Sequence, residues 1–381
     1  MTRPVHTLPK AHLHLHFTGS MRLATLEEMA ASHGVRLPRA LIENWPPDLG
    51  DAEVRGWFRF QRLYDAARAC VRGEADMRRI VDEAAADDAA EGSGWLELQV
   101  DPTSYAPFVG GLTPALEIVL DEARAAGERH GIGVGIVVAA SRTRHPLDAR
   151  TLARLAAHHA GDGPGQVVGF GLSNDERRGD TSDFAHAFRI AANAGLASVP
   201  HGGELLGAGH VEQVLDELHP DRIGHGVRSV EDPAVLEHVV ASGVTLEVCP
   251  GSNVALGVYH APGEVPLRTL ADAGVRIALG ADDPLLFGSR LAAQYESARA
   301  AHGFDDEALA GLARGSIKGS RAPESVRRSL LAGVDRWLET PEASNGSQGS
   351  EGSQGSEDSQ GSEDSQGSGW RADAAVESVG R

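Results

Sequence analysis

Four short segments of the chain place histidines and acidic residues at the ends of apolar runs. They are His14-Leu15-His16, His201-Gly202-Gly203-Glu204, Gly224-His225-Gly226 and Asp282-Asp283-Pro284. Residues two apart on a strand point to the same face, so the imidazoles of His14 and His16 can converge on one point. One such segment is a weak signal, because the chain has 17 histidines and Asp-Pro pairs are common in turns. The four segments together indicate one shared site.

The residue types in these segments match the preferences of a zinc ion. Three imidazoles and one carboxylate suit a borderline cation of this kind. The expected ligands are His14, His16, His201 and Asp282. An open position would take a water molecule, whose pKa falls on zinc from 15.7 towards about 7. Glu204 and His225 would then lie beside the ion as acid–base groups.

Lysine content separates this expectation from its nearest alternative, a phosphoesterase-type barrel hydrolase with two metal ions. In barrel hydrolases of that kind a modified lysine on the fourth strand often bridges the ions. The run 167–172 contains no lysine, and Lys10 and Lys318 are the only lysines of the chain. One ion per chain is therefore the preferred interpretation.

Eight β-rich runs, separated by helical stretches, would position these segments. The expected strands are 12–17, 95–100, 132–139, 167–172, 196–201, 222–226, 245–249 and 276–280. Strands that alternate with helices predict parallel pairing, and eight repeats favour a closed (β/α)8 TIM barrel of the α/β class over an open doubly wound sheet. Functional residues of such barrels lie at the carboxyl ends of the strands, where the four segments occur.

Helical stretches are expected between the strands. Among them are 114–126, 149–158 and 233–241. Pro114 and Pro233 would open two of these helices, because proline suits the first helical position. A further helical insertion after the first strand, 25–88, is too long for a simple connection and is expected to cap the barrel mouth.

The composition limits the partners and the location of the protein. The formal net charge of −19 disfavours binding to nucleic acid or to anionic membranes. Cys70 and Cys249 are too few for a disulfide framework, and the sequence has neither the apolar run of a signal peptide nor one of the roughly 20 residues that span a membrane. We expect a cytoplasmic protein, with a homo-oligomer left open.

The chain divides into two regions of different composition. Residues 1–340 carry the barrel pattern, whereas residues 341–381 are rich in Ser, Gln, Gly, Glu and Asp and repeat a Ser-Gln-Gly-Ser-Glu unit. Such a segment has too little apolar surface to offset the entropy of ordering, so a disordered tail is expected. Trp370 and Val376 leave a partner-binding role open.

Several motifs resemble those of the adenosine deaminase family of the amidohydrolase superfamily. The matching segments are 8–20, 201–204, 222–226, 247–253 and 282–284. The resemblance spans nearly all of residues 8–330 and implies zinc-dependent hydrolysis of the 6-amino group of an adenine-containing nucleoside, with release of ammonia. The His-x-Glu and Pro-Cys-x-x-Cys signature of the other zinc deaminases is absent, because Cys249-Pro250 lacks the second cysteine.

The resemblance also implies roles for single residues. The family's zinc ligands correspond to His14, His16, His201 and Asp282, and its substrate contacts correspond to His16, Thr18, Asn174 and Asp283. Glu204 would donate a proton to purine N1, which makes C6 electrophilic. His225 would orient and deprotonate the attacking water and stabilise the developing charge. Asp283 would share a hydrogen bond with N7, which requires a proton on one of the two partners.

Three positions depart from the family pattern. Thr18 stands where an aspartate usually holds the ribose 5′-hydroxyl, and the loss of that charged contact should cost about 1–3 kcal/mol of binding. Asn174 replaces a glycine whose backbone N–H reaches purine N3 in many relatives. Gln99 replaces an arginine and is interpreted as a change in the barrel interior. The departures leave the zinc chemistry intact and bear on the substrate.

Adenosine or deoxyadenosine is the first expectation for the substrate. The alternatives are adenosines with a bulky 5′ substituent, such as 6-aminodeoxyfutalosine or methylthioadenosine, and free adenine. Arg177 and Arg178 could meet an anionic substituent, although solvated surface arginines are the preferred interpretation. A barrel that binds purines without catalysis is disfavoured, because it would be expected to have lost at least one metal-ligating or acid–base residue.

Overall fold

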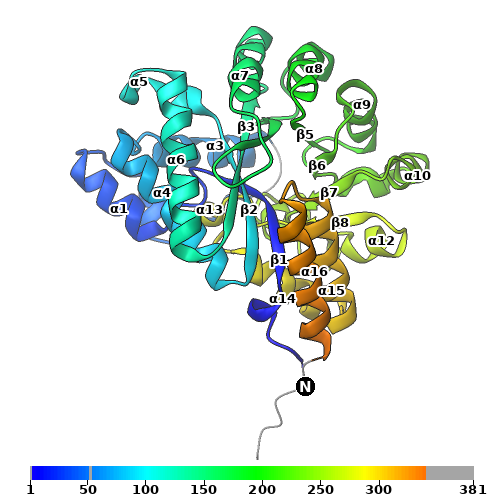
Figure 1. The fold of residues 1–381 in the computed structure, drawn as a ribbon. Coiled ribbons are helices and arrows are strands. Elements are labelled where there is room, and N and C mark those ends of the chain that lie inside the picture. The colour runs from blue at the N-terminus through cyan, green and yellow to red at the C-terminus, as the bar shows by residue number, and fades with distance from the viewer. Residues whose placement is uncertain (1, 51–53, 340–381) are drawn as a thin grey trace, which may run out of the picture. The chain divides into compact units, whose positions relative to one another are not determined.

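Eight parallel strands form the centre of the molecule in a computed structural model that describes residues 2–50 and 54–339 (Figure 1). The strands are β1 Lys10–His16, β2 Ser93–Val100, β3 Gly133–Ser141, β4 Val167–Ser173, β5 Ala197–Gly202, β6 Arg222–His225, β7 Thr245–Val248 and β8 Arg276–Leu279. Each strand pairs with the next one along the chain. Every expected strand is present, with ends that differ from the prediction by at most two residues.

The segment after β8 returns to β1 and brings the two ends of the sheet together. The backbone nitrogen of Asp282 donates to the carbonyl oxygen of His14 at 3.0 Å, and that of His16 donates to the carbonyl oxygen of Asp282 at 3.0 Å. These bonds join the first and last strands into a TIM barrel, as the sequence predicts. They also place Asp282 directly beside the two histidines of β1.

Helices surround this barrel (Figure 1). The α-helices are α1 Leu23–Ser32, α2 Arg39–Ile42, α3 Val54–Arg68, α4 Glu74–Ala90, α5 Ala106–Val109, α6 Leu112–His130, α7 Pro146–His158, α8 Ala185–Asn193, α9 Ala208–Leu218, α10 Pro233–Ser242, α11 Pro250–Ala255, α12 Leu267–Asp272, α13 Pro284–Phe287, α14 Leu291–His302, α15 Asp306–Gly319 and α16 Glu324–Glu339. Short 3-10 turns occupy Val5–Thr7, Pro102–Ser104, Thr181–Phe184, Val227–Glu231 and Pro262–Glu264.

Proline is the first residue of one of the two helices that were predicted to begin with it. Pro233 is the first residue of α10, as predicted, and Asp232 caps that helix by accepting the backbone N–H of Ala234 at 2.9 Å. The start predicted at Pro114 is wrong, because α6 begins two residues earlier at Leu112. The nitrogens of the first helical turn have no intrahelical partner, so proline is tolerated inside that turn as well as at its first position.

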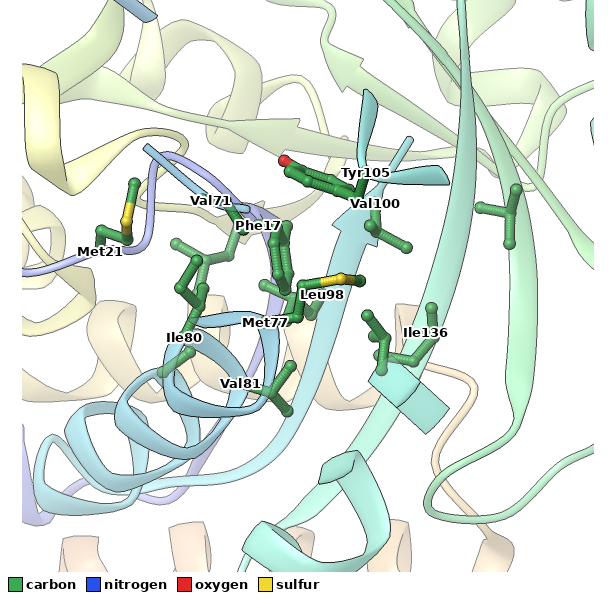
Figure 2. Close-up of a cluster of buried hydrophobic side chains, with 14 of the residues drawn as sticks. Phe17, Met21, Val71, Met77, Ile80, Val81, Leu98, Val100, Tyr105 and Ile136 are labelled. Carbon is green, nitrogen blue, oxygen red and sulfur yellow. The ribbon is translucent and has the colours of Figure 1, made fainter. Parts of the chain in front are cut away.

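The helical insertion between β1 and β2 has two different parts. Helix α4 packs against β2 and α6, in the position of an ordinary barrel helix. Figure 2 shows its side chains Met77, Ile80 and Val81 beside Leu98 and Val100 of β2. Each of these side chains is almost completely buried, which contributes roughly 1.5–3 kcal/mol apiece. Helix α4 is therefore a barrel helix and does not form the expected cap.

Two further expectations concern the C-terminal tail and the absence of a membrane-spanning helix. The predicted tail, 341–381, and the boundary at about residue 340 lie outside the described residues. Among residues 2–50 and 54–339, none of the helices combines the length and the apolar character needed to cross a bilayer.

Candidate active site

The structure brings the four predicted metal ligands together at the carboxyl ends of the strands. Oδ1 of Asp282 lies 3.2 Å from Nε2 of His16 and 3.7 Å from Nε2 of His14. Nε2 of His201 lies 3.3 Å from Nε2 of His16. Two ligands at neighbouring positions of one zinc ion, each about 2.1 Å from it, are about 3–3.5 Å apart. The distances from His16 to His201 and to Asp282 therefore fit a shared ion.

The hydrogen bonds around His14 also fit a metal ion. Nδ1 of His14 contacts Oε2 of Glu247 at 2.8 Å, which fixes the ring and leaves Nε2 for a ligand. Nε2 is buried and has no hydrogen-bond partner among the described residues. A buried nitrogen without a partner is costly, and a cation shared with His16 and Asp282 would satisfy it.

A buried ion-pair network holds the His14–Glu247 pair in place. The guanidinium of Arg222 at the start of β6 donates to Glu247 of β7 and to Glu97 of β2, and all three side chains are inaccessible or nearly so. Burial alone would raise the pKa of Glu247, but Arg222 and His14 lower it. Glu247 therefore stays ionised and accepts the His14 proton, which fixes the tautomer that a metal ligand needs.

Glu204 and His225 lie beside the ligand cluster, as the sequence predicts. Oε2 of Glu204 is 3.7 Å from Nε2 of His225, which is itself 3.9 Å from Oδ2 of Asp282. Burial, with Asp282 and Glu176 nearby, raises the pKa of Glu204 well above its ordinary value. Burial lowers the pKa of His225 to about 4. These shifts favour a protonated carboxyl at Glu204 and a neutral imidazole at His225, the protonation states that a proton donor and a proton acceptor require.

The two consecutive aspartates after β8 have pKa values that are shifted in opposite directions. Burial alone would raise the pKa of Asp282, but His16, His14 and His225 lower it well below the usual range. Burial, with Asp282 adjacent, raises the pKa of Asp283 well above the usual range despite the nearby His16. These shifts favour a carboxylate at Asp282, which suits a cation, and a protonated carboxyl at Asp283, which can donate.

Gly19 leaves room for the Asp283 side chain. A Cβ atom built on Gly19 would lie 1.7 Å from Oδ1 of Asp283 and 2.7 Å from its Cα. Because the nearer obstacles include backbone, a larger residue would displace Asp283. The glycine after Thr18 is therefore part of the site.

A pocket opens from the ligand cluster towards the insertion. Its inner wall includes His16, His201, Glu204, Asp282 and Asp283. Its outer wall is formed on one face of α3 by Trp57, Phe60, Gln61, Tyr64 and Arg68. The cap predicted over the barrel mouth is thus confirmed for α3. These α3 residues were missed in the sequence, although aromatic residues at 57, 60 and 64 have the spacing of a single helix face.

The three positions that depart from the family pattern lie at or beside this pocket. The Thr18 hydroxyl is 2.5 Å from the hydroxyl of Tyr105, itself a lining residue that sequence reasoning missed. Asn174 lines the pocket in a left-handed conformation, φ 82°, which asparagine tolerates better than most residues. Gln99 also lines it, with Nε2 3.5 Å from Nδ1 of His14. Gln99 therefore lies beside a predicted metal ligand, whereas the sequence was interpreted as placing it in the packing of the barrel interior.

The two arginines that were named as possible contacts for an anionic substituent, Arg177 and Arg178, do not line this pocket. Arg177 pairs with Asp175 at 2.8 Å. The cation that does line it is Arg68, whose guanidinium pairs with Asp65. His12, to which the sequence assigned no role, contacts Asp88 at 2.9 Å and accepts the backbone N–H of Ala281 at 3.0 Å.

The fold and site together define a deaminase hydrolase of the amidohydrolase type on a TIM barrel. The family model described as adenosine deaminase matches residues 9–337. The chain belongs to the adenosine deaminase family.

Relatives of this family differ in the substrates that their names give. A "Putative adenosine/adenine deaminase" of Streptomyces virginiae is 61% identical over 88% of this chain and 98% of the relative. An "Adenine deaminase" of Rhizobium leguminosarum is 35% identical over 85% of this chain and 98% of the relative. The crystal structure of adenine deaminase from Arthrobacter aurescens superposes with a TM-score of 0.80 at 28% identity, covering 89% of this chain and 100% of that one.

Proposed function

We propose that this protein hydrolyses the exocyclic 6-amino group of an adenosine-type nucleoside to the 6-oxo product and ammonia, with one zinc ion per chain. The observation that carries the proposal is the convergence of His14, His16, His201 and Asp282 beside the buried carboxyl of Glu204. Zinc bound there would act as a Lewis acid and lower the pKa of a water molecule towards about 7.

The side chains around the ligands supply the proton transfers. The Glu204 carboxyl would donate its proton to purine N1, which draws electrons from C6 and opens that carbon to attack by water. The imidazole of His225 would take the proton from the attacking water, since burial keeps it neutral. His225 would pass the proton taken from water to the amino group, which leaves the tetrahedral carbon as ammonia, and the C6 hydroxyl would give its proton to the Glu204 carboxylate. Water supplies the oxygen of the product, and both side chains regain their starting protonation, so atoms and charge balance.

Asp283 would orient the purine ring. Its carboxyl is buried, its Oδ1 has no hydrogen-bond partner among the described residues, and its pKa is raised. A protonated Asp283 can donate to the N7 lone pair of an unprotonated purine. The backbone N–H of Asn174 would reach N3 from the loop after β4.

The extent of the pocket supports a nucleoside over the free base. Its lining continues beyond the cluster of polar residues to Trp57, Gln61 and Arg68 on α3. Adenine would engage the inner part alone, whereas a ribose would extend towards α3. Adenine remains an alternative, because relatives named adenine deaminases share the fold.

An adenosine with a larger 5′ group, such as 6-aminodeoxyfutalosine or methylthioadenosine, is the second candidate substrate. Thr18 stands where relatives usually carry an aspartate, and its hydroxyl is already paired with that of Tyr105. The aromatic side chains of α3 could contact an apolar substituent, and Arg68 could bind a carboxylate at its end.

An ammonia-release assay on adenine, adenosine, deoxyadenosine, methylthioadenosine and 6-aminodeoxyfutalosine tests these assignments. We expect turnover of adenosine and deoxyadenosine, with kcat/KM above that for adenine. The variant Arg68→Ala, with Arg62→Ala as an exposed control on the same helix, tests the second candidate. A selective loss of kcat/KM for the carboxylate-bearing substrate in Arg68→Ala would favour it. Release of ammonia from none of the five compounds would refute the proposed function.

A further inference from the structure

The loop that carries Glu204 is held by one buried carboxylate from the neighbouring loop. Glu176 follows β4, and its side chain has no exposed surface. Its Oε1 accepts the backbone N–H of Glu204 at 3.1 Å, and its Oε2 accepts those of Leu205 and Leu206 at 2.9 Å each. Three consecutive N–H groups thus converge on a single side chain.

The opposite edge of the same loop is held by Arg228. The backbone nitrogen of Arg228 donates to the carbonyl oxygen of Gly203 at 3.2 Å, and its Nη1 donates to that of Leu205 at 2.6 Å. Gly203 has φ 72°, and a Cβ there would lie 2.3 Å from Cγ2 of Val211. The turn between His201 and Glu204 therefore has little freedom, and Glu176 is the side chain that binds the N–H of Glu204.

Glu176 itself belongs to a network that reaches the metal-ligand strand. Nδ1 of His210 lies 3.5 Å from its Oε2, and Nε2 of His210 lies 3.2 Å from the hydroxyl of Thr181. Arg142 donates to that hydroxyl and, at 2.8 Å, to the carbonyl oxygen of His201. Burial alone would raise the pKa of Glu176, but His210 and the backbone donors lower it to about 2. The acceptor is thus an anion at neutral pH.

We propose that Glu176 is a positioning residue, which fixes the backbone from which the Glu204 carboxyl reaches the substrate. The inference rests on the proposed role of Glu204 as proton donor. A donor displaced by about 1 Å loses on the order of a hundredfold in rate. Glu176 does not line the pocket and binds the backbone of the loop, so its removal should lower kcat more than it alters substrate binding.

Amide hydrogen exchange tests the anchoring directly and independently of activity. In Glu176→Ala, peptides that cover residues 204–206 should exchange faster than in the wild type. Glu176→Gln should have a smaller effect, because its amide oxygen can still accept. The control is Asp180→Asn, an exposed carboxylate that accepts the backbone N–H of Ser182 at 3.0 Å and none of the three donors. Unchanged exchange in Glu176→Ala would overturn the proposal.

Kinetics on the metal-replete variants test the consequence for the reaction. Glu176→Ala should lower kcat by about a hundredfold, with KM changed by less than roughly threefold and with metal content as in the wild type. Glu176→Gln should recover part of the loss, and Asp180→Asn should retain wild-type kcat. Loss of metal, or an equal change in kcat and KM, would indicate a general structural role and overturn the proposal.

A double variant separates this inference from the proposed function. If Glu176 acts through Glu204, then Glu176→Ala should cause little further loss in a Glu204→Gln background. A full hundredfold loss in that background would overturn the proposal. Full activity of Glu204→Gln alone would refute the proton-donor role on which the proposal rests. Full activity of Glu176→Ala beside an inactive Glu204→Gln would overturn the positioning role only.

Discussion

At the scale of single residues, burial sets the protonation states that the proposed reaction uses. Glu204, His225 and Asp283 are each at most 3% exposed, and burial is the first cause of every shift in their pKa values. In water at neutral pH, the carboxyl groups of Glu204 and Asp283 would be ionised, and the imidazole of His225 would be partly protonated. The site therefore depends on exclusion of water as much as on the identity of the side chains.

The proton donor gives the first prediction at this scale. Glu204→Gln preserves shape and hydrogen bonding but removes the acidic proton, so kcat should fall by roughly 10²–10⁴-fold. Metal content and the binding of a purine product should stay within a few-fold of wild type. Steady-state kinetics and elemental analysis of the same preparation check both statements, and near-normal kcat would refute the assigned role.

The sequence reveals the residues whose types are unusual for where they stand. Histidine and aspartate at the ends of β-rich runs, as at His14 and Asp282, are recognisable without coordinates because strand ends of a barrel meet. Arg68, Tyr105 and Glu176 were not found in this way. Their roles come from contacts between segments far apart in the chain, and no local pattern distinguishes them from ordinary surface or loop residues.

At the scale of elements, the site occupies the places where strands end in strained turns. Four residues other than glycine have positive φ among the described residues, and three of them, Asn174, His225 and Asp282, lie in the site. Such conformations cost of order 1–3 kcal/mol each and persist only where the surrounding structure enforces them. The hydrogen bonds between loops, including those to Glu176, supply that enforcement.

The Glu176 anchor predicts a specific acid sensitivity. Its pKa is lowered from 4.5 to about 2, so its contribution to stability is complete above pH 4.5 and is lost as the pH falls towards 2. The shift corresponds to roughly 3 kcal/mol. Urea unfolding of wild type and Glu176→Gln should therefore differ clearly at pH 7 and converge near pH 2–3. A difference that is the same at both pH values would contradict this assignment.

Element boundaries were predicted well where periodicity is strong and less well at helix starts. All eight strands lie within two residues of their expected ends, because buried parallel strands are short apolar runs with sharp limits. The start of α6 at Leu112 was missed, since proline fits anywhere in a first turn. The insertion was recognised, but α4 proved to be a barrel helix, and among the described residues of the insertion those that line the pocket belong to α3.

At the scale of the whole molecule, the barrel pattern and the C-terminal composition predict two independent parts. Residues 341–381 have too few apolar side chains for a packed segment, so they should add nothing to the barrel's stability. A chain that ends at residue 340 should unfold within about 2 °C of the full chain and retain its kcat. Thermal unfolding and the ammonia assay test this, and a large loss of either would show that the tail supports the barrel.

The proposed reaction depends on a single ion held at the barrel mouth. Elemental analysis of the purified protein is the direct test, with Asp282→Ala and His16→Ala as variants that each remove one ligand. We predict about one zinc per chain in the wild type and little in either variant. Two ions per chain, no bound metal in an active wild type, or full zinc in both variants would contradict the assignment.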